Sequence, residues 1–284
     1  MRINTYEFEI TSRSQSLDLY FIADTHIGCR GFSATALQKD INTVKDNPNA
    51  RWIGLGDWCE AINYTDPRFD ADTIDPEFHN YLDDLHFRQG HVAFDRFLIQ
   101  IKDKCIGIHT GNHDDKIRKK YHYKYVDKYC DEWGVPYLGF TALTRLVIVR
   151  KTKNETPSKK TIILLTGHGS VAGRKDGGKT NRLNDMMSMF EADIYAIGHG
   201  HKKITTRCNI IGISTNKKPR IINRKKIGLM TGAYLRGYIE DHSSYVEEKM
   251  LPPTDLGMVG INIKLGCGRE NGHPIETIDY KVIS

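Results

Sequence analysis

The chain has 284 residues, of which 39% are hydrophobic and 27% are charged, the balance of an ordinary globular protein. Its 41 basic and 35 acidic residues give a net charge of +6, which is compatible with an anionic partner without requiring one. No apolar run approaches the roughly 20 residues of a membrane span, and residues 1–16 lack the apolar core of a signal peptide. With six scattered cysteines typical of reduced thiols, the composition favours a cytoplasmic enzyme or binding protein without a membrane partner.

Five short apolar runs, each ending in a small polar cluster, follow one another along the first two thirds of the chain. In chain order they are 17–24, 51–57, 105–114, 161–169 and 192–201. Runs of this length, rich in Ile, Leu and Tyr and stopped by glycine, are typical of buried strands. Between them, residues 78–101 repeat apolar side chains every three or four positions, as a helix does. The alternation predicts an α/β layered sheet, in which sites form beyond the carboxyl ends of strands.

Four further strands are predicted, and they suggest a second, more antiparallel sheet. They are 143–151, 221–232, 258–265 and 276–284. No internal repeat or long Pro/Ser linker divides the chain, so a single domain over 1–284 is the simplest interpretation.

Side chains that can bind a metal follow each of the five strands. They are Asp24 and His26, Asp57, Asn112 with His113, His168, and His199 with His201. Carboxylate, carboxamide and imidazole ligands together suit a borderline divalent metal such as manganese, iron, cobalt, nickel or zinc. The set is too large for one tetrahedral site, but two sites sharing a bridging carboxylate would use all of it. Asp-x-His alone is weak, and Gly-Asn-His-Asp and Gly-His-x-His are each moderately specific, whereas five motifs in this order at strand ends form a specific pattern.

With these motifs the chain resembles the calcineurin-like metallophosphoesterases. The matching motifs are Asp-Thr-His (24–26), Gly-Asp (56–57), Gly-Asn-His-Asp (111–114), Gly-His (167–168) and Gly-His-Gly-His (198–201). The resemblance covers about residues 17–201, with the closing strands of the fold supplied by about 221–284. It implies a metallo-dependent phosphatase-like fold, a four-layer α-β-β-α sandwich with two central mixed β-sheets.

The resemblance also implies a role for each residue. One divalent ion, with manganese expected first, would be bound by Asp24, His26 and His201, a second by Asn112, His168 and His199, and Asp57 would bridge the two. A hydroxide between the ions would attack phosphorus, while His113 donates a proton to the leaving oxygen.

A histidine in that role needs an acid to orient it. In the phosphatase branch the acid stands three positions after the bridging aspartate, which is Glu60 here, and Asp114 is the competing candidate. Protein Ser/Thr phosphatases carry arginine after that acid and glutamate after the Asn-His pair. This chain has Ala61 and Asp114 instead, and both differences favour the diesterase and nuclease branches.

Basic residues near the motifs suggest a polyanionic substrate. Apolar side chains recur every fourth residue from Ile117 to Trp133, which predicts one helix with a buried face. Its first bases, beside the metal motif, are placed to hold phosphates flanking a scissile one, although lysines on a helix are also typical of a solvated face. These bases are Lys116, Arg118, Lys119 and Lys120.

Residues 173–180 match the Walker A pattern of P-loops. A P-loop should leave its strand directly, but Ser170, Val171 and Ala172 lie between the end of the strand and the match, and that strand end already carries a metal motif. A substrate-binding loop with Arg174, Lys175 and Lys179 is the better interpretation, and a plain surface turn is its alternative.

Together these observations predict a dinuclear metal-dependent phosphodiesterase acting on nucleic acid or a nucleotide. A phosphomonoesterase for a small phosphorylated metabolite or nucleotide stays open. A non-catalytic binding module on the same fold is a further alternative, and the complete set of ligand positions argues against it. The acidic segment 61–78 would repel a polyanion if it lined the cleft.

Overall fold

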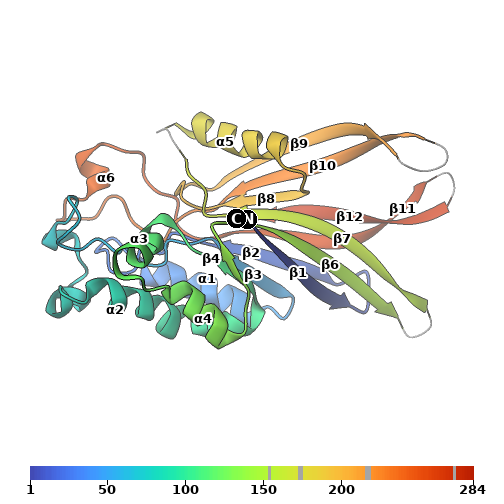
Figure 1. Cartoon of the computed structure of the whole chain (residues 1–284). Coiled ribbons are helices and arrows are strands. Elements are labelled where there is room, and N and C mark those ends of the chain that lie inside the picture. Colours follow the sequence, from blue (N-terminus) through green and yellow to red (C-terminus); the bar gives the residue numbers. More distant parts are fainter. Residues whose placement is uncertain (153–154, 172–174, 215–218, 271–272) are drawn as a thin grey trace.

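Two six-stranded β-sheets form the centre of the protein (Figure 1). The computed structural model describes residues 1–152, 155–171, 175–214, 219–270 and 273–284. The first sheet has the order β1 (Arg2–Ile10), β6 (Thr141–Thr152), β7 (Glu155–Gly167), β8 (Ile194–Ile197), β10 (Ile221–Met230), β9 (Ile204–Ile213). The second has the order β12 (His273–Ile283), β11 (Val259–Glu270), β2 (Ser16–Ile22), β3 (Ala50–Gly54), β4 (Cys105–His109), β5 (Tyr137–Gly139). Both sheets are mixed, since β7 and β8, and likewise β2, β3 and β4, run parallel beside antiparallel neighbours.

Three apolar clusters hold four layers together. Between the sheets, Phe21 and Ile53 of the second sheet share a buried cluster with Leu164 and Ile194 of the first. The outer face of the first sheet is covered by α5 (Asp176–Met189), whose Leu183 is fully buried against β8. The outer face of the second sheet is covered by α1 (Ala34–Asp46), α2 (Leu85–Val92) and α4 (Tyr125–Trp133), on the opposite side of the molecule from α5 (Figure 1). The predicted α-β-β-α sandwich is thus confirmed.

Local sequence explains the helix that follows β2. The hydroxyl of Ser33 accepts a hydrogen bond from the Ala36 backbone N–H (3.4 Å), which caps the start of α1. Leu37, Ile41 and Val44 then recur every three or four residues and are all fully buried. The segment 78–101, predicted as a helix, is helical but irregular. It contains α2 flanked by the 3-10 turns η2 (Pro76–Tyr81) and η4 (Leu98–Lys104) and the π turn η3 (Ala93–Phe97).

Two predictions about the elements are wrong in detail. The helix expected over Ile117 to Trp133 is two helices, α3 (Asn112–Tyr121) and α4, because His122 adopts a left-handed backbone (φ 53°) that ends α3. The four late strands do not form a sheet of their own. Two of them, β6 and β10, extend the first sheet, and β11 and β12 extend the second. No helix in the described part of the chain combines the length and apolar character that crossing a membrane would need.

Candidate metal centre

The five predicted strand ends converge on one region between the two sheets. Asp24 and His26 follow β2, Asp57 follows β3, and Asn112 follows β4, in the second sheet. His168 follows β7, and His199 and His201 follow β8, in the first sheet. Because β2, β3 and β4 are parallel, and β7 and β8 are parallel, these ends lie at the same edge of each sheet. The structure therefore brings all seven predicted metal-binding side chains into two groups.

The first group consists of Asp24, His26 and His201. The Nε2 atoms of His26 and His201 lie 3.1 Å apart, and Asp24 Oδ1 lies 3.3 Å from His201 Nε2 and 3.9 Å from His26 Nε2. The other oxygen of Asp24 accepts the backbone N–H of His199 (2.8 Å), which fixes the carboxylate. Oδ1 itself is buried and has no hydrogen-bond partner.

The second group surrounds His168. Its Nε2 lies 3.0 Å from Asn112 Oδ1, 3.1 Å from Asp57 Oδ2 and 3.1 Å from His199 Nδ1. Its Nδ1 donates a hydrogen bond to the backbone carbonyl of Leu55 (2.9 Å). Since a carbonyl oxygen only accepts, Nδ1 carries a proton, and Nε2 points its lone pair at the other ligands when the ring is neutral.

Both groups fit a divalent metal ion. A buried carboxylate oxygen without a hydrogen-bond partner is costly, and a divalent ion beside Asp24 Oδ1 would satisfy it. An ion at the usual 2.0–2.2 Å from nitrogen and oxygen ligands would place those ligand atoms about 3–3.5 Å from one another, close to the spacing observed. Asp57 belongs to the second group, with His168 and His199. Its bridging role, the number of ions and their identity stay predictions.

Five of the seven candidate ligand residues have left-handed backbones. The φ angles are 54° at Asp24, 46° at His26, 56° at Asp57, 62° at His199 and 50° at His201. Such conformations are uncommon outside glycine and cost of order 1–3 kcal/mol each, so they persist only where the surroundings enforce them. Their concentration at these strand ends marks the region as a functional site by a criterion independent of the motifs.

The glycines of the motifs let backbone and ligand side chains approach closely. A Cβ at Gly111 would lie 2.1 Å from Asp57 Oδ1, and one at Gly198 would lie 2.9 Å from Asp24 Oδ2. Gly56 has a φ of 96° and packs against Gly111, with 2.4 Å between its Cβ position and the Gly111 nitrogen. A side chain at these positions would displace the ligands.

His113 stands beside both groups and is held from two sides. Its backbone N–H donates to Asp57 Oδ1 (2.8 Å), and its Nδ1 donates to the backbone carbonyl of Glu60. The Glu60 carboxylate, expected to orient His113, instead contacts His26, whose Nδ1 lies 2.7 Å from Oε2. Glu60 thus contacts His113 through its backbone carbonyl and the candidate ligand His26 through its carboxylate, the kind of contact that orients a histidine ligand in a metal site.

Asp114, the other candidate acid, also contacts groups other than the His113 ring. Its buried carboxylate accepts the backbone N–H groups of Gly111 (2.8 Å), Asp57 (2.9 Å) and Trp58 (3.1 Å), together with the hydroxyl of Tyr125. Burial, and then the charge of Asp57, raise the pKa of Asp114, while these hydrogen bonds oppose the increase. Asp114 therefore joins the two loops that carry Asp57 and Asn112.

We expect Asp114→Ala to lower the free energy of unfolding by about 3 kcal/mol or more, because it leaves three buried N–H groups without an acceptor. Tyr125→Phe removes one donor to the same carboxylate and should cost only about 1 kcal/mol. Urea denaturation of metal-free protein would measure both. Equal, small losses would show that water replaces the carboxylate.

The histidines of the site should release protons when a metal binds. Burial alone would lower their pKa values, but the charge of Glu60 on His26 and that of Asp57 on His168 raise both to about 9. Both rings are then protonated at pH 7 without metal, and a ligand nitrogen must lose its proton. We expect manganese binding at pH 7 to release close to two protons, and its affinity to rise with pH up to about 9. Calorimetry in buffers of different ionisation enthalpy measures this release, and identical heats in all buffers would contradict it.

We call the first and second groups of candidate ligands the metal groups. Most of the predicted substrate-binding residues lie away from the metal groups or already have a hydrogen-bond or ion-pair partner. On α3, Lys116 pairs with Asp66 (3.2 Å), and Arg118 and Lys119 pair with Asp115 (2.5 and 2.8 Å). Lys120 donates to Thr65 Oγ1 (2.6 Å). Lys175 is exposed just before α5, and Arg174 lies outside the described residues.

The Walker A match is not a phosphate-binding loop in its described part, because residues 176–180 form the first turns of α5. Lys179 is half-buried and donates to the backbone carbonyl of Gly200 (2.8 Å), between the ligands His199 and His201. Of the predicted bases that the structure describes, Lys179 is the one that lines a cavity beside the metal groups.

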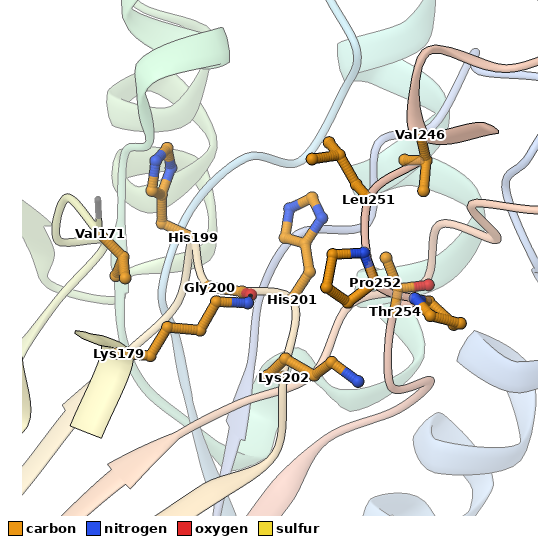
Figure 2. Close-up of a pocket in the computed structure, with 11 residues that line it drawn as sticks. Val171, Lys179, His199, Gly200, His201, Lys202, Val246, Leu251, Pro252 and Thr254 are labelled. Atoms are coloured by element: carbon orange, nitrogen blue, oxygen red, sulfur yellow. Dashed lines mark hydrogen bonds between the residues drawn. The ribbon is translucent and has the colours of Figure 1, made fainter. Parts of the chain in front are cut away.

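That cavity has a volume of about 180 Å³ and opens beside His199 and His201 (Figure 2). Its far wall is formed by Val246, Leu251 and residues 252–254, which the sequence analysis did not connect with the site. The segment lacks the periodic apolar pattern that predicts a helix or strand. The Pro-Pro pair at 252–253 was the one local signal in it, and it indicates a loop of restricted conformation.

No family model matches the chain, and no curated protein matches it. Similar solved structures include vacuolar protein sorting 29 from Cryptosporidium parvum, with 11% identity and a TM-score of 0.36 over 94% of this chain and 98% of that one. A double mutant of vacuolar protein sorting 29 from Entamoeba histolytica has 12% identity and a TM-score of 0.37 over 94% and 100%. A conserved uncharacterized protein from Streptococcus pneumoniae, described as a predicted phosphoesterase, has 9% identity and a TM-score of 0.34 over 93% and 99%.

These likenesses are distant, and the site is argued from its own residues. The order of the five motifs, their positions at the ends of parallel strands and the two mixed sheets between helices are all present in the described structure. In these features the chain resembles the calcineurin-like metallophosphoesterases.

Proposed function

We propose that the protein is a metal-dependent phosphoesterase with a preference for phosphodiesters, and that manganese is its first candidate ion. The observation that carries the proposal is the buried, unpartnered Oδ1 of Asp24 facing the Nε2 atoms of two histidines. A second group of the same chemical composition, around His168, stands beside it. Divalent ions in such groups supply positive charge that draws in phosphoryl oxygens and acidifies water.

The residues of the chain supply orientation and a proton. His113 is fixed by its bonds to Asp57 and to the Glu60 carbonyl, and the latter occupies Nδ1. Nε2 is therefore the atom that can pass a proton to the oxygen leaving phosphorus. Glu60 holds the tautomer of His26, and the Leu55 carbonyl holds that of His168, so both rings present Nε2 to the site.

The residue at position 61 supports the preference for diesters. Ala61 is buried with a φ of 51°, and its N–H donates to Gln89 Oε1 (3.0 Å). Its methyl group cannot hold the second negative charge of a phosphomonoester as an arginine at this position would. A diester carries one negative charge and does not need that contact.

The proposal is tested by comparing hydrolysis of bis-p-nitrophenyl phosphate with that of p-nitrophenyl phosphate. Protein stripped of metal and reloaded with manganese is used, with His199→Ala as the control. A diester preference that is lost in the variant is the expected result. A monoester preference would favour a phosphomonoesterase, and the absence of turnover with full metal content would favour a non-catalytic binding module.

A further inference from the structure

The cavity beside His201 has one apolar wall and one basic wall. Figure 2 shows His201 between His199 and the segment that carries Leu251 and Pro252. Lys179 approaches from the other side, toward Gly200. The cavity therefore begins at two candidate metal ligands and continues between an apolar wall and a basic one, an arrangement suited to a ligand with a phosphate at one end and an apolar group at the other.

The apolar wall is fixed to the metal centre. The N–H of Leu251 donates to the Val246 carbonyl (2.9 Å), and the Tyr238 hydroxyl donates to the Leu251 carbonyl (2.8 Å). Four residues on, the N–H of Asp255 donates to the carbonyl of the ligand His201 (3.0 Å). The wall is thus formed before any ligand enters, which reduces the entropy cost of binding.

The basic wall offers one available cation. Lys202 is paired with Asp255 (3.2 Å), so its charge is matched. In the described part of the chain, the hydrogen bond of Lys179 goes to the Gly200 carbonyl (2.8 Å), not to a carboxylate. Burial, as the largest influence, lowers the pKa of Lys179. An ammonium group has three N–H donors, so Lys179 keeps donors for a ligand anion.

The size of the cavity limits what can enter. Its volume of about 180 Å³ is below the roughly 300–1,000 Å³ of pockets that enclose a whole drug-sized molecule. We infer that it receives the ring of a single nucleotide unit whose phosphate lies at the metal groups, while Lys179 holds an oxygen of the same nucleotide. The inference rests on the proposed function and narrows its substrate to a small diester of one nucleotide or the end of a single strand, excluding the interior of a duplex.

Binding to manganese-loaded protein tests the inference without turnover. Calorimetry with adenosine 5′-monophosphate and with inorganic phosphate should show that the nucleotide binds at least about tenfold more tightly. Leu251→Phe, which puts a larger side chain into the cavity, should abolish that preference and leave phosphate binding unchanged. Leu256→Ala, a change on the same segment outside the cavity lining, should keep it. Lys179→Met should weaken binding of the nucleotide, whereas Lys45→Met, which changes an exposed lysine of α1 on the opposite side of the sandwich, should not.

Two results would overturn the inference: equal affinity for nucleotide and phosphate, or a nucleotide preference that survives Leu251→Phe. Metal content, measured separately, shows whether a variant has lost its ions instead of its cavity. If the wild type hydrolyses no ester but keeps a preference that Leu251→Phe removes, the proposed function fails and the cavity assignment stands. Competition of adenosine 5′-monophosphate with a 5′-phosphorylated trinucleotide distinguishes a single nucleotide from the end of a strand as the source of the ring. Only a cavity open to strand ends admits the trinucleotide.

Discussion

Asp57→Asn is expected to lower manganese affinity by more than about 100-fold and to abolish measurable hydrolysis. Even hydrogen-bond partners of ligands contribute about 10–100-fold to metal affinity, and Asp57 is a candidate ligand itself. The substitution keeps the shape of the side chain. It also keeps an oxygen that can accept the His113 N–H, which in the wild type lies 2.8 Å from Asp57 Oδ1. What it removes is the negative charge 3.1 Å from His168 Nε2. Metal content after dialysis, by plasma mass spectrometry, measures the loss.

The number of ions lost reveals the role of Asp57. A bridge serves both groups, so both ions should leave together, whereas a ligand of the second group alone would release one. Asp66→Asn is the matched control, because Asp66 pairs with Arg68 and Lys116 away from the metal groups. Full metal retention in Asp57→Asn would show that the negative charge of Asp57 is not needed to hold either ion, and would contradict the bridging role.

For His113→Ala we expect turnover of a diester with an alkoxide leaving group to fall by roughly 10²–10⁴, the usual contribution of a positioned general acid. The ring stands 4.8 Å from that of His26, in an edge-on arrangement, and only 8% of the residue is exposed. Its Nδ1 is committed to the Glu60 carbonyl, so no other atom than Nε2 remains for proton transfer. Metal content should stay near that of the wild type.

Esters with different leaving groups distinguish a proton-donating role of His113 from a structural one. p-Nitrophenolate leaves without a proton, whereas an alkoxide needs one, so His113→Ala should slow an alkyl ester much more than a nitrophenyl ester. Equal losses on both would mean that the ring positions the substrate by charge or contact. Loss of bound metal in the variant would identify His113 as a ligand, a role compatible with its proximity to His26 and Glu60.

The sequence predicted the metal groups because their positions depend on a simple rule of topology. Parallel strands place their carboxyl ends at one edge, so Asp24, Asp57 and Asn112 had to meet once β2, β3 and β4 were recognised. Apolar strands that alternate with helices predicted a layered α/β sheet, because strands without a polar face require cover on both sides, whereas the four-layer sandwich with two sheets was implied by the family resemblance. Such patterns lie within short stretches of sequence, so they can be recognised without knowing which strands pair with each other.

Contacts made by loops could not be predicted in the same way. Glu60 stands three residues after Asp57, yet the left-handed turn at Ala61 and the neighbouring loop decide that its carboxylate contacts His26. The break at His122 is equally invisible, because an every-fourth apolar pattern continues through it. Pairing of strands is also non-local, so nothing in the sequences of β6 and β11 shows that they belong to different sheets.

The metal groups draw ligands from both sheets, and this has a mechanical consequence. Asp24 and His26 extend from the second sheet and His201 from the first, and the same division holds for Asp57 and Asn112 against His168 and His199. An ion bound in either group would therefore cross-link the two sheets of the sandwich. By mass action, an ion at 100 times its dissociation constant adds about 2.7 kcal/mol to the stability of the folded state. A movement of one sheet relative to the other would have to break bonds between an ion and its ligands. The concentration of free metal would therefore influence how rigidly the two sheets are held together.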